Sequence, residues 1–161
     1  MSLKASKLTE ARSVIKAIKE KDPKNKEKYN IKYLTMTEVP EELITSGVLF
    51  DEASGNLEVL KKCDAIIYIF ESNDSEQVDF IKKANEKFKE TSVLKFVPSI
   101  LLQSKMDLQM PESGENRAML GQTLASELNI KVYKEISAAA NFGNDGFSET
   151  IDAVLMTCSE P

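Results

Sequence analysis

The sequence predicts an α/β protein with a doubly wound, mostly parallel sheet and helices on both faces. Two apolar runs, residues 63–72 and 98–108, have the continuous hydrophobic character of strands that are buried on both faces. A helical stretch joins them, and strand-like and helix-like segments alternate through the rest of the chain. Parallel strands need right-handed crossovers, so the connecting helices must pack back onto the sheet.

Composition is consistent with one domain over residues 1–161. The chain is 42% apolar, which is enough for a core, and it contains two cysteines and no histidine. Without histidine the usual general base, the Ser/His and Cys/His nucleophile pairs and most zinc sites are excluded, and we predict no metal site. Cys63 and Cys158 form no Cys-x-x-Cys motif, so reduced, buried thiols in a cytoplasmic protein are expected.

Charge is divided unevenly along the chain. Residues 1–32 hold 10 Lys and Arg against 4 Asp and Glu, a net +6, whereas the remainder holds 11 against 22, a net −11. The lysines of this basic segment lack interleaved aromatic residues and alternate with acidic ones, so a solvated face is favoured over nucleic-acid binding. We therefore predict no nucleic-acid partner. No apolar run reaches the ~18 residues of a membrane span, so no membrane segment is expected.

The basic N-terminal segment, residues 1–28, has two interpretations. Apolar residues over 8–18 fall at helical spacing, which favours a helix ending before Asp22-Pro23. In the alternative, residues 12–20 form the first arm of a hairpin with 29–38. The second segment, residues 29–39, has the pattern of a strand that Pro40 stops. We prefer the helix for the first segment.

The middle of the chain contains the first parallel strand and its crossover helix. Residues 41–56 show no clear period and are predicted to be a loop with at most a helical turn. The strand is expected near 64–71. Residues 75–90 then form an amphipathic helix that begins near Ser75, and its apolar face consists of Val78, Ile81, Ala84 and Phe88.

The C-terminal third repeats the alternation. A strand over 98–104 is followed by a polar turn and a helix over roughly 117–128. Residues 130–137 form the next strand. A loop over 138–146 then leads to a closing helix that begins near residue 147.

Three segments carry a resemblance to a known family. They are Ser104-Lys105-Met106-Asp107-Leu108, the stretch from Lys62 to Asp74, and the stretch from Leu34 to Glu41. Together they resemble a small GTPase of the Ras superfamily, most closely the C-terminal GTPase domain of the mitochondrial Rho (Miro) family. The resemblance covers about Tyr33 to Met156 and implies a small-GTPase-like fold of the P-loop NTPase class.

The resemblance also implies a base-binding site. In the family's pattern, Asp107 accepts two hydrogen bonds from the guanine edge and Lys105 lays its alkyl stem along the base; a carboxylate offers two acceptors to two adjacent donors. Ser104 stands where the family has Asn, Thr or Ala, which weakens the supporting contact. Ser137 and Ala138 follow a strand, where backbone amides would reach the base oxygen. The plainer alternative makes Lys105 and Asp107 ordinary polar residues of a strand-to-helix turn.

The phosphate-binding elements of the family are missing from the sequence. No Gly-x-x-x-x-Gly-Lys-Ser/Thr motif occurs, and the place of the family's Asp-x-x-Gly is taken by Glu38-Val39-Pro40-Glu41, which lacks glycine. Phosphoryl transfer depends on phosphate positioning and Mg²⁺. We therefore predict no catalytic residues, no GTP hydrolysis and no firmly bound cofactor in this chain, leaving weak GTP or GDP binding open.

The missing phosphate loop has a structural consequence under this resemblance. The strand that precedes it in the family lies centrally, between the strands predicted at 29–38 and 64–71. Either the 29–38 strand pairs with 64–71 in its absence, or a neighbouring chain supplies a strand in a strand-swapped dimer. We prefer the first option, because the helical spacing over 8–18 fits it, and the sequence leaves a monomer or a strand-swapped dimer open.

The resulting functional hypothesis is a Miro-type switch or pseudo-GTPase interaction module with protein partners. By resemblance it would act at the cytosolic face of the outer mitochondrial membrane. The alternative is an α/β enzyme that uses strand-end carboxylates on a small-molecule or nucleotide substrate, with Glu38, Glu71, Asp74 and Asp107 as candidates. A third possibility is an interaction module that binds no small ligand.

Overall fold

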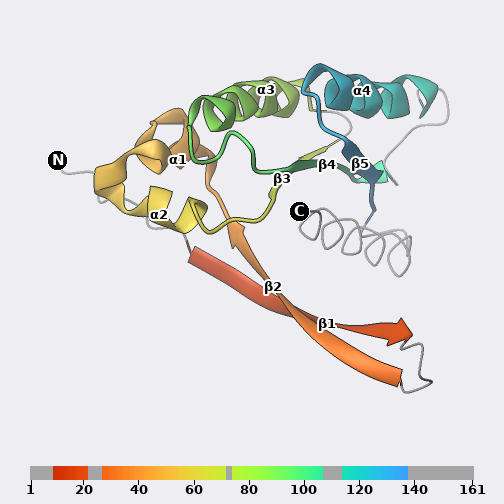
Figure 1. Ribbon diagram of the computed structural model, residues 1–161. Coiled ribbons are helices and arrows are strands. Elements are labelled where there is room, and N and C mark those ends of the chain that lie inside the picture. The colour runs from red at the N-terminus through yellow and green to blue at the C-terminus, as the bar shows by residue number, and fades with distance from the viewer. Residues whose placement is uncertain (1–8, 22–26, 72–73, 107–113, 138–161) are drawn as a thin grey trace. The chain divides into compact units, whose positions relative to one another are not determined.

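The computed structural model describes residues 9–21, 27–71, 74–106 and 114–137 (Figure 1). The chain divides into two compact units, residues 1–59 and 60–161, and each is described by itself. The single domain over 1–161 remains a prediction.

A two-stranded antiparallel hairpin dominates the first unit. Strand β1 (Thr9–Lys21) pairs with β2 (Glu27–Glu38) from Thr9 opposite Glu38 to Lys21 opposite Glu27, with an irregularity between Glu10 and Ser13. The preferred helix over 8–18 is therefore wrong, and the hairpin alternative is confirmed. The preferred pairing of 29–38 with 64–71 is also wrong, because β1–β2 is a sheet of its own.

The error has a local physical cause. Val14, Ile15 and Ile18 are β-branched, and such side chains lose rotamer freedom in a helix but fit a pleated strand. Only five residues separate β1 from β2, so pairing the two arms closes a short loop at little entropic cost. Apolar residues at helical spacing are therefore compatible with a strand when a partner lies this close in the sequence.

Short helices fill the rest of the first unit. They are α1 (Glu41–Thr45), η1 (Val48–Phe50), η2 (Glu52–Ser54) and α2 (Asn56–Leu60). The prediction of a loop with at most one helical turn understated this order. Leu43, Ile44, Leu49 and Leu57 are buried, so apolar burial stabilises helices that are too short to persist alone.

The second unit contains the predicted parallel sheet. Its strands are β3 (Ile66–Glu71), β4 (Ser99–Ser104) and β5 (Val132–Glu135), in the order β3-β4-β5. Both neighbouring pairs are parallel, as predicted. Ile100, Leu101 and Leu102 of the central strand are buried, which explains why its sequence shows no alternation between apolar and polar residues.

Two helices make the crossovers, at the predicted places. Helix α3 (Ser75–Glu90) joins β3 to β4, and α4 (Gly114–Glu127) joins β4 to β5. Both lie on the same face of the sheet (Figure 1). The described part thus confirms an α/β architecture with a parallel sheet. The predicted loop over 138–146 and the closing helix fall outside the described residues, as does Cys158.

Local chemistry fixes both ends of these helices. The Asp74 carboxylate accepts hydrogen bonds from the Glu76 and Gln77 amides and so caps the start of α3. At the end of α4, Asn129 has a φ of 55°, and the Ile130 amide donates to the Ala125 carbonyl at 2.8 Å. This left-handed Asn with a bond back across the last turn is a Schellman cap.

The face beneath the helices is partly polar. Tyr68 is buried against α3, where its ring meets Phe88 edge-on, with 6.3 Å between the ring centroids. Gln103 is fully buried, and the Tyr133 hydroxyl lies 2.5 Å from its Oε1 and 2.9 Å from Glu135 Oε1. The single Tyr133 proton can be donated to either oxygen.

We expect the protein to lose stability in alkaline solution. Burial is the main cause that raises the pKa of both Tyr68 and Tyr133 above the ordinary value near 10. A raised folded-state pKa gives stability that is complete below pH 10 and declines as pH rises above it, because the unfolded chain then loses the protons first. Urea unfolding from pH 8 to pH 11 should show this decline. A Tyr68→Phe, Tyr133→Phe double variant should flatten it, and an unchanged slope would contradict the assignment.

Cys63 is half-buried, and its Sγ donates to the Ala65 carbonyl. Within the described segments, no helix has the length and apolar character needed to cross a membrane.

Candidate functional site

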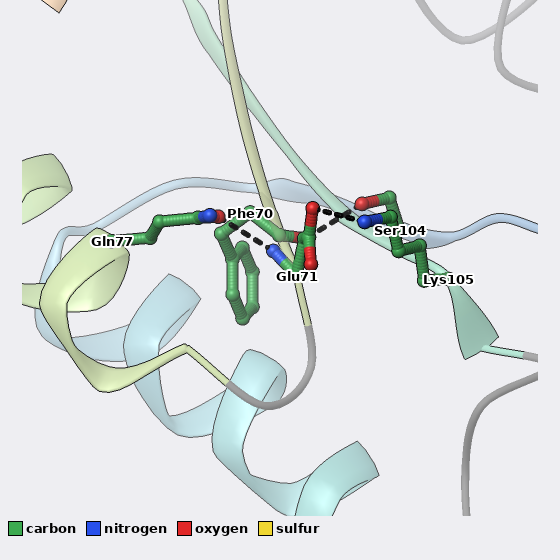
Figure 2. Close-up of polar contacts among 5 residues, drawn as sticks. All are labelled: Phe70, Glu71, Gln77, Ser104 and Lys105. Carbon is green, nitrogen blue, oxygen red and sulfur yellow. Dashed lines mark hydrogen bonds and ion pairs between the residues drawn. The ribbon is translucent and has the colours of Figure 1, made fainter.

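The candidate site lies at the carboxyl ends of β3 and β4. Parallel register places Glu71, the last residue of β3, beside Ser104, the last residue of β4. The Ser104 hydroxyl donates to the Phe70 carbonyl at 3.1 Å, which ties the two strand ends together (Figure 2). Strand ends of this kind form the edge at which open α/β sheets bind their ligands.

Lys105 follows β4 in an unusual backbone conformation. Its φ is 55°, in the left-handed region that costs a residue with a Cβ about 1–2 kcal/mol. Its Nζ lies 2.5 Å from Glu71 Oε1, so the side chain reaches across to the end of β3 (Figure 2). Both side chains are about half exposed, so the ion pair itself contributes little stability. Backbone strain of this type is concentrated at functional sites in proteins.

Side-chain hydrogen bonds fix the end of β3 and the start of α3. The Glu71 amide donates to Gln77 Oε1 at 2.9 Å, and Asp74 accepts the first-turn amides of α3. A helix N-terminus after a parallel strand is a common anion site, because its free amides and dipole attract negative charge. Here the Asp74 carboxylate already fills that position, so an added phosphate would meet like charge.

The site extends to the end of β5. The Ile136 amide donates to the Gln103 carbonyl at 2.8 Å, and the Met106 amide donates to the Ile136 carbonyl at 3.3 Å. The turn after β4 is therefore fixed beside the turn after β5. Ser137, the next residue, is buried.

The structure thus brings together three of the five predicted binding residues, Ser104, Lys105 and Ser137. Asp107 and Ala138 lie outside the described residues. Sequence reasoning named Glu71 only as an acid of the enzymatic alternative and missed it as the partner of Lys105. No local sequence pattern indicates this pair, because the pair depends on the register between two strands that are more than thirty residues apart in the sequence.

Two carboxylates of the enzymatic alternative already have partners within the second unit. Glu71 pairs with Lys105, and Asp74 caps α3. Glu38 is an exposed residue of the first unit. Among the residues that the structure describes, no three His, Cys, Asp or Glu side chains are placed to hold a metal ion.

The conformation of Lys105 predicts which of two substitutions gives the more stable protein. Lys105→Ala and Lys105→Gly both remove the ion pair, but only glycine adopts a φ of 55° without steric cost. We expect the glycine variant to be about 1 kcal/mol more stable than the alanine variant in urea unfolding, the reverse of the usual order. Exposed Lys83 of α3 supplies the matched control, where Ala should be the more stable by about 1 kcal/mol. Equal stability of the two Lys105 variants would contradict the strain.

No protein-family model matches the chain, and no curated protein matches it significantly.

Proposed function

We propose that this chain is a GTPase-like module that recognises a guanine base at the turns after β4 and β5 and acts through protein contacts, without hydrolysing GTP. The single observation that best supports the proposal is the strained conformation of Lys105 directly after the central strand, next to Met106, whose amide donates to the Ile136 carbonyl. The resemblance of Ser104-Lys105-Met106-Asp107 supplies the guanine preference.

Two observations favour binding without turnover. The sequence contains no phosphate-cradling motif, and the start of α3 is capped by Asp74. Ligand affinity would therefore come from the base, and nucleoside and nucleotide should bind with similar strength. By resemblance to the Miro family, we place the module at the cytosolic face of the outer mitochondrial membrane, as part of the same proposal.

Calorimetric titration tests the proposal. Guanosine, GDP and GTP, with and without Mg²⁺, should bind with similar weak affinity, and adenosine should not bind. Asp107→Ala should abolish the preference for guanine, because it removes the two acceptors that face the guanine donors. Exposed Asp64, two residues before β3 and so at the other end of the sheet, is the matched control, and Asp64→Ala should bind as the parent does.

Two outcomes would overturn the proposal. Equal binding of guanosine and adenosine would exclude guanine recognition. Absence of heat with every ligand would remove the nucleotide from the function and leave a protein-interaction module.

A further inference from the structure

The two edges of the β3-β4-β5 sheet differ in how they are protected. Edge strands of natural proteins are usually short or carry charge, which prevents pairing with other chains. Strand β5 is four residues long and includes Lys134 and Glu135. Strand β3 is six residues long, and its residues 66–70 contain no charge, glycine or proline. In the described part of this sheet β3 pairs only with β4, although its sequence is typical of an interior strand.

Exposure of an apolar side chain accompanies this unprotected edge. Ile69, in the middle of β3, is 56% exposed on the face opposite the helices, whereas its neighbours Tyr68 and Phe70 are buried beneath them. An exposed isoleucine alone needs no explanation. In an uncharged, unprotected edge strand it marks a surface suited to strand addition.

The main-chain groups available at this edge are defined by the ladder. The Ile66 amide donates to the Pro98 carbonyl, so alternation directs the groups of Ile66, Tyr68 and Phe70 toward β4. Those of Ile67 and Ile69 then point outward. The next outward amide, that of Glu71, already donates to Gln77. The open edge therefore consists of two residues, each with one donor and one acceptor.

We propose that this edge pairs with β3 of a second copy, antiparallel across a two-fold axis. Centred on Tyr68, the pairing sets Ile67 opposite Ile69 of the second copy and Ile69 opposite its Ile67. Four hydrogen bonds then use all the outward groups of both copies, and each exposed Ile69 meets an apolar side chain. No charged residue faces a like charge. Because each sheet has one protected and one unprotected edge, association closes at a dimer and forms no filament.

Sedimentation velocity of the full chain across a concentration series tests the dimer, together with amide hydrogen exchange at Ile67 and Ile69. We expect twice the monomer mass at high concentration and protection of both amides that rises with concentration. Ile69→Pro removes only an outward amide, so β4 pairing and the fold should persist while the dimer weakens about 10- to 100-fold. Ile69→Lys should weaken it as well. Val93→Lys, at another exposed apolar residue of this unit, should not.

Three results would overturn the proposal. One is a monomer at every concentration with both amides unprotected. Another is a monomer with both amides protected, which would mean that a strand of the same chain covers the edge. The third is a dimer that Ile69→Pro and Ile69→Lys leave intact, which would place the interface elsewhere.

Discussion

Phe70→Ala is expected to destabilise the second unit by about 3–5 kcal/mol, because it removes an aromatic ring from the core. Phe70 is 1% exposed, and its ring points toward the helices that cover this face of the sheet (Figure 2). Removing the ring leaves a cavity that the surrounding strands and helices cannot close without moving the sheet. The substitution should also disturb the candidate site, because the Phe70 carbonyl accepts a hydrogen bond from the Ser104 hydroxyl.

The preceding residue of the strand supplies the control. Ile69→Ala deletes an apolar side chain from the same strand, but Ile69 is largely exposed, so this change should cost less than about 1 kcal/mol. Urea unfolding at low protein concentration measures both variants without interference from association. Similar losses for the two variants would contradict the assignment of the two faces of β3.

Gly121→Ala is expected to destabilise the protein by about 1–3 kcal/mol, although alanine is the better helix former by about 1 kcal/mol. Gly121 lies in α4 directly over the polar group beneath it. A Cβ there would lie 2.5 Å from Tyr133 Cε2 and closer still to the Tyr133 hydroxyl and Gln103 Oε1. Gln103 is fully buried and the Tyr133 hydroxyl is bonded to it, so the clash can be relieved only by breaking that contact.

A double-mutant cycle isolates the cause. Tyr133→Val removes both the ring and the hydroxyl that the new methyl would meet, so Gly121→Ala should cost much less in its presence. Thermal and urea unfolding of the four proteins give the coupling free energy. Additive effects, or a stabilising Gly121→Ala in the parent, would show that α4 does not approach the sheet as closely as the structure indicates.

The parallel half of the fold was predictable because its signals are strong and agree with one another. The uncharged runs of β3 and β4 are too apolar for an exposed surface, and the amphipathic pattern of α3 is long enough to define its buried face. The hairpin was missed because β1 carries apolar residues at a spacing that suits a helix as well as a strand. The pairing strand β2 begins only five residues after β1 ends, and its presence makes the segment a strand. The periodicity of one segment taken alone does not reveal such a partner.

The positions of the candidate site residues in the fold were predictable to a similar degree. Strand ends locate Ser104, Lys105 and Ser137 from the sequence alone, since the carboxyl ends of parallel strands meet at one edge. The left-handed conformation of Lys105 was not predictable, because this region is rare for lysine and nothing in the local residues requires it. Its pairing with Glu71 depends on register between strands more than thirty residues apart, which only the fold defines.

Amide chemical-shift mapping with guanosine tests whether the turns after β4 and β5 bind a base. Guanosine carries no phosphate, so any binding reports the base site alone. We expect shift changes concentrated at Lys105, Met106, Ile136 and Ser137, and weaker changes with adenosine. No shift changes with guanosine, or changes confined to residues of α3 or of the first unit, would contradict base recognition at the ends of β4 and β5.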